Sequence, residues 1–99
     1  DQFLEVLDIR EFVGDSDSAL VRLKGRVIGE RGKTRQILEE TTKVHISIYG
    51  KTISLIGTAE QLAVARQALG MLLSGAKHSS VYRFLERKRR EAKSRTKFH

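Results

Sequence analysis

The amino-acid sequence predicts an α+β fold, and three observations carry this prediction. Residues 44–48 and 52–56 alternate between apolar and polar side chains, and a turn containing Gly50 joins them, which predicts a tight antiparallel hairpin. Residues 3–13 are rich in Val, Ile and Phe, which predicts a first strand. The segments between and after these strands contain helix-capping residues and apolar residues at helical spacing, which predicts helices. The predicted order is strand, helix, helix, strand, strand, helix, followed by a basic helical extension.

The first two predicted helices lie on either side of a glycine-containing segment. The turn cluster at 14–18 offers Asp17 or Ser18 as the cap of a short helix over 19–24. The second helix is expected to run from the end of the glycine segment, at residue 33, to about residue 42.

The later helices are predicted from a capping box and from helical spacing. Thr58 and Gln61 form the capping box of a helix that is expected to end near Leu73. Its apolar face comprises Leu62, Ala65, Leu69 and Leu72. A last helix is expected to begin near Ser79 or Ser80 and to anchor itself through Val81, Tyr82, Phe84 and Leu85. Nearly every residue beyond Leu85 is charged, so we expect this part of the helix to project from the domain or to fray.

Composition is compatible with one domain of modest core. The chain has 99 residues, of which 39% are hydrophobic and 31% charged. Cysteine is absent, which excludes a disulfide framework, a thiolate zinc site and a cysteine nucleophile. No apolar run approaches the ~20 residues of a membrane span, and no signal-peptide pattern opens the chain. The chain begins at Asp1 rather than Met, so we expect an excerpt of a longer protein.

Positive charge is concentrated in two parts of the chain. The net charge is +7, but residues 1–19 carry six acids and one base. Residues 20–44 carry seven bases and three acids, and residues 81–99 carry eight bases and two acids. Such a distribution favours a polyanionic partner through electrostatic steering and counterion release. A basic surface that is merely solvated remains the alternative.

The glycine pair Gly29 and Gly32 is the most informative motif. Glycine adopts positive φ at little cost and lets a ligand approach the backbone closely. The helix expected after Gly32 directs unpaired N–H groups and the positive end of its dipole toward the same loop. Arg31 and Lys33 add cationic side chains there. The segment therefore predicts a cradle for a phosphate backbone.

Catalytic and metal-dependent functions find no support in the sequence. An NTPase P-loop needs a glycine five residues before Gly32, where Val27 stands. The three histidines, His45, His78 and His99, are scattered and have no cysteine partners, so we expect no metal site. No nucleophile–base or paired-carboxylate arrangement is recognisable, and we expect neither enzymatic activity nor a cofactor.

The glycine motif and its surroundings resemble the type I KH domain family. That family has Ile-Gly-x-x-Gly, then a helix that ends in an acidic pair near Thr, then a hairpin; residues 28–32, 38–41 and 46–48 match this pattern. The resemblance implies a β-α-α-β-β-α order, with a three-stranded antiparallel sheet and helices on one face. It also implies that the loop clamps about four nucleotides of single-stranded RNA or DNA. The bases would enter an apolar groove between the two helices and the second strand.

A narrower resemblance covers nearly the whole chain. Residues 3–9, 29–35, 53–57, 63–68 and 72–75, continued by 81–85, are similar to the Partner of NOB One group of small-subunit ribosomal RNA processing proteins, especially archaeal ones. Members of this group carry two KH modules, and the chain resembles the second. The resemblance implies binding to precursor small-subunit ribosomal RNA near its 3′ end, partnership with an endonuclease and with ribosomal proteins, and an intracellular location. That location is cytoplasmic for an archaeal protein, and nucleolar or pre-ribosomal for a eukaryotic one.

The expected RNA-binding residues surround the glycine loop: Lys24, Arg26, Ile28, Gly29, Glu30, Arg31, Gly32, Lys33, Arg35, Val44, His45 and Ile46. The backbone amides of 29–33 and the side chains of Arg31 and Lys33 are expected to hold phosphates, with Lys24 and Arg26 beside them. The expected floor of the groove comprises Ile28, Ile37, Val44 and Ile46. A secondary basic patch comprises Arg87, Lys88, Arg89 and Arg90.

Several of these residues allow two interpretations. Glu30 would repel a phosphate unless it points outward or pairs with Arg26 or Lys33. Arg35 either contacts RNA at the rim of the groove or forms a surface ion pair with Glu39 one turn later. Tyr49 stacks on a base or is an exposed turn residue, and His45 edges the groove or is a surface residue. The basic patch is a nucleic-acid arm, a localisation signal or a solvated helix end.

We therefore interpret residues 1–78 as a KH domain that binds single-stranded RNA, and residues 79–99 as a basic helical extension. The alternative is a protein–protein docking module of the same shape. It would use the acidic first strand or the helix at 81–85 to contact an endonuclease or a ribosomal protein, and would have little RNA affinity.

Overall fold

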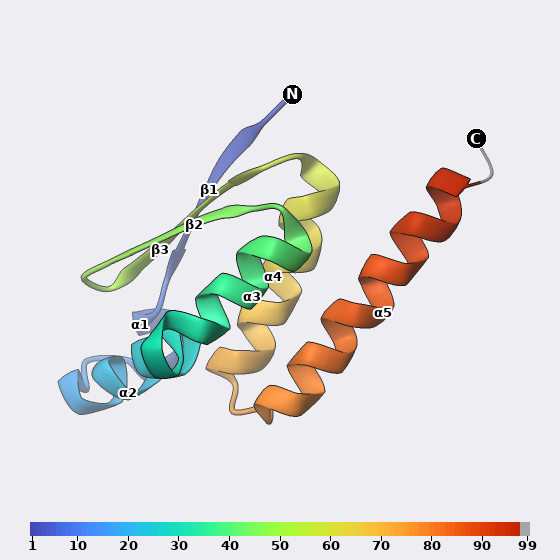
Figure 1. Ribbon diagram of the computed structural model, residues 1–99. Helices are drawn as coiled ribbons and strands as arrows, with labels where there is room; N and C mark the ends of the chain where they lie inside the picture. The colour runs from blue at the N-terminus through green and yellow to red at the C-terminus, as the bar shows by residue number, and fades with distance from the viewer. Residues whose placement is uncertain (98–99) are drawn as a thin grey trace.

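The computed structural model describes residues 1–97, so that residues 98 and 99, including His99, lie outside the described residues. Figure 1 shows the elements, whose bounds are β1 (Phe3–Asp8), α1 (Arg10–Val13), α2 (Asp17–Ile28), the 3₁₀ turn η1 (Glu30–Gly32), α3 (Lys33–Thr42), β2 (His45–Tyr49), β3 (Thr52–Gly57), α4 (Ala59–Leu73) and α5 (His78–Lys97). Among the described residues, no helix combines the length and the apolar character that crossing a membrane requires.

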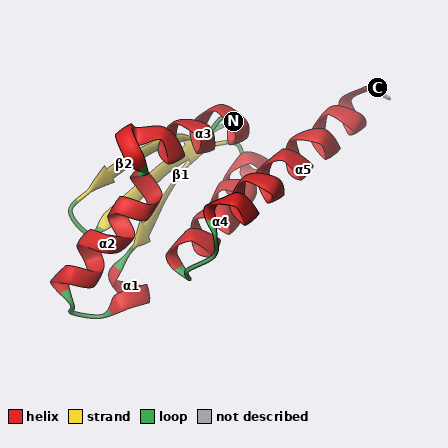
Figure 2. Cartoon of the chain, turned by 60° about the horizontal axis from the view of Figure 1, so that its bottom comes forward, coloured by secondary structure: helices red, strands yellow, loops and turns green. Residues whose placement is uncertain are grey.

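The three strands form one antiparallel sheet in the order β1-β3-β2. Leu55 in the central strand stands opposite Glu5 of β1 and Ile46 of β2. Figures 1 and 2 show α3, α4 and α5 together on one side of this sheet, and the other face is left open. The predicted α+β architecture and the antiparallel hairpin are confirmed.

One core joins the covered face of the sheet to the helices. Its fully buried side chains come from every layer: Ile46, Ile53 and Leu55 from the sheet, Leu38 from α3, Leu69 and Leu72 from α4, and Val81 and Leu85 from α5. The four predicted face residues of α4 are all buried. The predicted capping box is present as well, because Thr58 Oγ1 accepts the N–H of Gln61 at 3.2 Å and Gln61 Oε1 accepts the N–H of Thr58 at 3.0 Å.

The first strand is shorter than predicted. It ends at Asp8, whose Oδ1 accepts the backbone N–H of Arg10 at 2.9 Å and so turns the chain into α1. This side-chain bond competes with the strand ladder. The residue between them, Ile9, donates its N–H to the carbonyl of Lys51 at 2.8 Å and is fully buried.

The first predicted helix is wrong in both its bounds and its cap. The helix α2 runs to Ile28, and Ser16 caps it by accepting the N–H of Ala19 at 3.2 Å. Ser16 has the extended backbone of a cap residue, whereas Asp17 and Ser18 lie inside the first turn. Asp17 pairs instead with Arg10 at 2.8 Å.

The first part of the last helix, α5, packs against the rest of the domain, and its second part extends away from it. Val81, Phe84 and Leu85 belong to the core, and Tyr82 lies half-buried against it. The helix then continues away from the other elements to Lys97 (Figure 1). The packing does not divide the chain at residue 78, and a functional division there remains a prediction.

Arg26 joins the ends of three helices. Its Nε donates to the carbonyl of Leu72 in the last turn of α4 at 2.8 Å, and its Nη2 donates to the carbonyl of Ala76 in the segment between α4 and α5. His78, the first residue of α5, donates from Nε2 to the carbonyl of Arg26 at 3.0 Å. The guanidinium of Arg26 therefore has partners within the protein, and its expected place beside a phosphate stays a prediction. Helix ends leave carbonyls without partners, and a cation near them is favourable.

We predict that Arg26→Leu lowers the free energy of unfolding by about 2–3 kcal/mol, because two hydrogen bonds from a charged donor are lost. Arg26→Lys should lower the free energy of unfolding less, since lysine keeps the positive charge but lacks the several fixed N–H donors of the guanidinium. Urea unfolding followed by circular dichroism measures both. The control is Arg22→Leu, one turn earlier and exposed, which should change stability little. Equal unfolding midpoints for Arg26→Leu and the parent would contradict this role.

Candidate nucleic-acid interface

The glycine loop has a backbone that only certain residues tolerate. Gly29 ends α2 with φ 77° and ψ 170°, and a Cβ placed there would collide with the side chain of Thr34. Arg31 (φ 57°) and Gly32 (φ 74°) follow in the left-handed region. For Gly29, glycine is thus required both by its backbone angle and by the close approach of α3.

Three of the five loop amides already donate to backbone carbonyls, one in α2 and two in the loop itself. The N–H groups of Gly29 and Gly32 donate to the carbonyls of Gly25 at 2.8 Å and of Gly29 at 3.1 Å, and the N–H of Lys33 donates to Glu30. Within the described residues, the amides of Glu30 and Arg31 donate to no backbone carbonyl. The prediction that all five amides face a ligand is therefore wrong, because the left-handed turn closes bonds of its own. Two amides and the exposed side chains of Arg31 and Lys33 remain.

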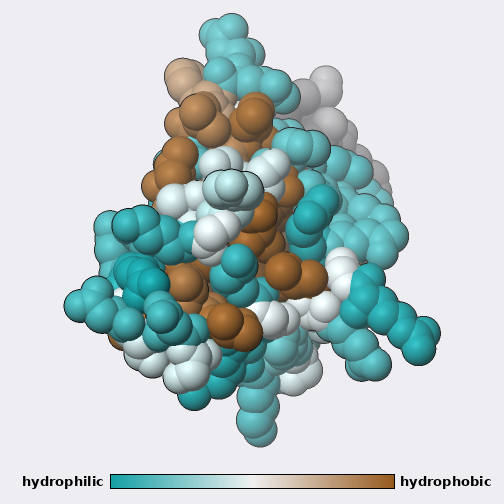
Figure 3. Space-filling model, turned by 90° about the vertical axis from the view of Figure 1, so that its left-hand side faces the viewer, coloured by the Kyte–Doolittle hydropathy of each residue, from teal (hydrophilic) through white to brown (hydrophobic). Residues whose placement is uncertain are grey.

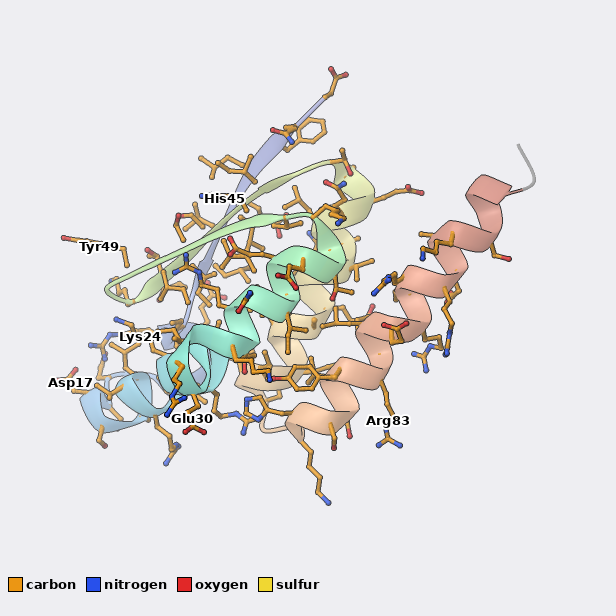
Figure 4. The ribbon with its side chains drawn as sticks, viewed as in Figure 1. Asp17, Lys24, Glu30, His45, Tyr49 and Arg83 are labelled. Atoms are coloured by element: carbon orange, nitrogen blue, oxygen red, sulfur yellow. The ribbon has the colours of Figure 1, made fainter. Side chains whose placement is uncertain are left out.

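The loop separates two sides of the helix pair. Figure 4 shows Lys24 beneath the tip of the β2–β3 hairpin, while Glu30 points away from the hairpin. Lys24 and Ile28 are half-buried and one turn apart on α2, so they share the side that faces the hairpin. Glu30 is exposed, and among the described residues it forms no ion pair. The outward orientation expected for Glu30 therefore holds, and its pairing with Arg26 or Lys33 does not.

Glu39 organises the edge of β2 next to α3. Its Oε2 accepts the N–H of Ile46 at 2.9 Å, and its Oε1 lies 3.6 Å from Nε of Arg35. Nδ1 of His45, a largely exposed side chain, is 3.8 Å from the same carboxylate. Arg35 therefore forms the ion pair with Glu39 and also stays half exposed at the rim. No pattern in the sequence indicated this role of Glu39 on the strand edge.

Two residues of the predicted groove floor are not available to a ligand. Val44 and Ile46 are 1% and 0% exposed, because they point into the core between the sheet and α3. Their predicted contact with bases is wrong for this reason. Ile28 and Ile37 are half-buried and retain surface on the helices.

The basic run at the end of the chain is divided between two faces of α5. Lys88 pairs with Glu91 at 3.6 Å, and Arg89 pairs with Glu86 at 3.7 Å. The other face carries Arg83, Arg87 and Arg90, whose spacing aligns them along the helix. Arg87 lies over the ring of Phe84, and Arg83 points away from the domain (Figure 4). The predicted patch of four consecutive cations is therefore two different surfaces.

A second hollow on the other side of the loop was not expected from the sequence. This cleft has a volume of about 910 Å³ and is lined by α2, the loop, the start of α3 and the first turns of α5. Tyr82 forms part of its wall, and its hydroxyl shares a hydrogen bond with Oγ1 of Thr34 at 2.9 Å. The sequence does place His78 and Tyr82 four residues apart near the start of the last predicted helix. However, His78 was interpreted as one of three scattered histidines, and Tyr82 as a residue that anchors this helix.

Comparison with known proteins agrees with this geometry. The model for the second KH domain of PNO1 proteins, described as a eukaryotic-type KH domain (KH domain type I), matches residues 3–90. A KH domain-containing protein of Methanocaldococcus jannaschii is 46% identical over 90 residues, which cover 91% of this chain and 39% of the relative. A pre-rRNA-processing protein PNO1 of Chaetomium thermophilum is 33% identical over 81 residues, which cover 82% of this chain and 30% of the relative.

A solved structure is similar over most of the chain. The crystal structure of a complex of a/eIF2α, aDim2p and rRNA from Pyrococcus horikoshii matches with a TM-score of 0.84 and 40% identity, covering 91% of this chain and 48% of that one. The chain thus spans less than half the length of each of these three proteins. The family match over residues 3–90 leads to one conclusion: the chain belongs to the eukaryotic-type, or type I, KH-domain family.

Proposed function

We propose that the chain is a module that binds single-stranded RNA, and that its RNA is precursor small-subunit ribosomal RNA near the 3′ end. The observation that carries the proposal is the exposed left-handed turn at Arg31 and Gly32, with the cations of Arg31 and Lys33 on it. The comparisons support the choice of RNA, because one relative is named a pre-rRNA-processing protein and the similar Pyrococcus structure contains rRNA.

The strand is held mainly by side chains. Phosphates contact the amides of Glu30 and Arg31 and the side chains of Arg31 and Lys33, while Lys24 and Arg35 supply charge on the hairpin side. The half-buried surfaces of Ile28 and Ile37 take the bases there, and His45 lies at the edge of β2. The role proposed for these residues is binding, and no catalytic step is assigned to them.

We predict that replacing Glu30 and Arg31 together by Asp weakens binding of short single-stranded RNA by about a hundredfold or more. Arg31 loses its contact with the phosphates, and an anion takes its place. Asp tolerates the left-handed backbone at position 31, so the fold should persist. The measurement is a filter-binding titration at low salt, with circular dichroism as a check of folding.

Lys43→Asp is the matched control for this double variant. Lys43 is exposed, has φ 66° like Arg31, and lies at the opposite end of α3. The change in net charge is the same in both variants, so a general electrostatic effect would weaken both. Tight RNA binding by the double variant would show that the loop is not the site.

We predict that the arginine face of α5 adds to binding only when the RNA is long. For an RNA of four to eight nucleotides, the slope of log affinity against log salt should be about −2 to −3, as for three or four phosphates at about 0.7 each. An RNA of about 25 nucleotides should give a steeper slope, because it also reaches Arg83 and Arg90. The variant Arg83→Gln/Arg90→Gln should remove the additional slope.

Lys88→Gln/Arg89→Gln removes the same charge and serves as control. Both of these cations already pair with Glu91 and Glu86, so the steep slope should remain. If the two double variants flatten the slope equally, the arginine face has no specific role.

The open face of the sheet favours a second candidate function, docking of a protein such as an endonuclease or a ribosomal protein. Leu4, Val6 and Ile56 are 67%, 55% and 40% exposed, and Leu4 and Ile56 are cross-strand partners. Figure 3 shows groups of apolar side chains on this side of the molecule, with neutral and hydrophilic residues between them. The helix at 81–85 is not available for docking, because its apolar residues are in the core. Absence of RNA binding at low salt would favour this function over the first.

A further inference from the structure

The cleft of about 910 Å³ beside the loop is separate from the side of the helix pair that faces the hairpin. Helical spacing places Lys24 and Ile28 toward the hairpin, whereas Arg22 and Gly25 line the cleft. The loop lies between the two surfaces and contributes to the cleft through Glu30 and its neighbours. The volume of the cleft falls in the range of about 300–1,000 Å³ that is usual for small-ligand sites.

The charge of the cleft selects an anionic ligand. Its lining contains four cations, Arg22, Arg26, Arg31 and Lys33, against one carboxylate, that of Glu30. Arg22, Arg31 and Lys33 are exposed and form none of the ion pairs among the described residues. Their charge is therefore available to a phosphate.

An aromatic wall faces these cations. His78 and Tyr82 are half-buried, with ring centroids 6.1 Å apart and planes inclined by 55°. Each ring is held by a hydrogen bond at its polar end, Tyr82 to Thr34 at 2.9 Å and His78 to the carbonyl of Arg26 at 3.0 Å. An aromatic ring held in this way offers a face on which any of the four nucleobases can stack.

Gly25 leaves the α2 side of the cleft without a side chain. Glycine inside a helix lowers its stability relative to alanine, and no neighbouring atom requires it here, because a Cβ at this position would meet nothing within 4 Å. Gly25 lines the cleft midway between Arg22 and Gly29, so its backbone is open to close approach by a ligand.

We propose that this cleft is a second nucleotide subsite, which takes the nucleotide next to those held by the loop. Its phosphate lies against Arg22 and the loop cations, its sugar passes over Gly25, and its base stacks on the ring of Tyr82, with His78 at its edge. This inference rests on the proposed RNA-binding function, but it concerns a surface that the loop contacts do not require.

The test compares Gly25→Ala with the parent, using pools of random-sequence RNA of four and eight nucleotides and amide chemical shifts of the 99-residue chain. We expect the short pool to bind both proteins alike and to shift amides of the loop. The long pool should also shift the amides of Arg22, Gly25 and Tyr82 in the parent. It should bind Gly25→Ala about tenfold more weakly, as expected for loss of one stacked base.

Gly70→Ala is the matched control. Gly70 lies inside α4, where an added Cβ would likewise meet nothing within 4 Å, and it does not line the cleft. Both alanine variants should raise the melting temperature, and only Gly25→Ala should weaken binding of the long pool. Equal long-pool affinities for the two variants, or a loss of short-pool binding in Gly25→Ala, would overturn the subsite while leaving the loop function in place. Failure of both pools to bind the parent would overturn the loop function, and the subsite with it.

Discussion

The position of the glycine loop depends on the guanidinium of Arg26. This group donates to the carbonyl of Leu72 at the end of α4 and to that of Ala76 just after it, and the backbone carbonyl of Arg26 accepts a hydrogen bond from the ring of His78. The end of α2, the end of α4 and the start of α5 are thereby fixed to one another. Because the loop begins three residues after Arg26, its location relative to α5 is set by these bonds rather than by a ligand.

A second contact sets the shape of the loop. Thr34 is 3% exposed, lies directly beneath Gly29 and shares a hydrogen bond with Tyr82. Together with the amide bonds inside the loop, this contact keeps the turn in its left-handed form without a ligand. A turn ordered in advance loses little conformational entropy on binding. The internal bonds also leave fewer amides free, so the proposed phosphate contacts fall mainly on the cationic side chains.

The sequence predicted the features that depend on neighbours along the chain. The hairpin around Gly50, the capping box of Thr58 and Gln61, and the inner face of α4 are determined by spacings of two to four residues, and all three are present. The same is true of the glycine loop as a motif. For such features the local pattern and the final packing agree, which is the usual condition of a sequence that folds well.

The features that the sequence did not indicate depend on partners distant in the chain. No spacing connects Arg26 with Leu72 and Ala76, which lie 46 and 50 residues away, so its charge alone suggested a phosphate contact. Val44 and Ile46 fit a half-buried strand, but only the packing of α3 on the sheet shows that they lack exposed surface. The end of the first strand at Asp8 depends on a side-chain bond that an apolar pattern does not reveal.

The last helix connects these observations, because it is both a part of the core and a part of the charged surface. Val81, Phe84 and Leu85 fill the core, Tyr82 supports Thr34 beneath the loop, and Arg83 and Arg90 face outward. Removing the whole helix would therefore disturb the support of the loop and the long-range charge at once. Point changes on its outer face alter the charge alone, and for this reason they separate the arginine face from the loop where truncation does not.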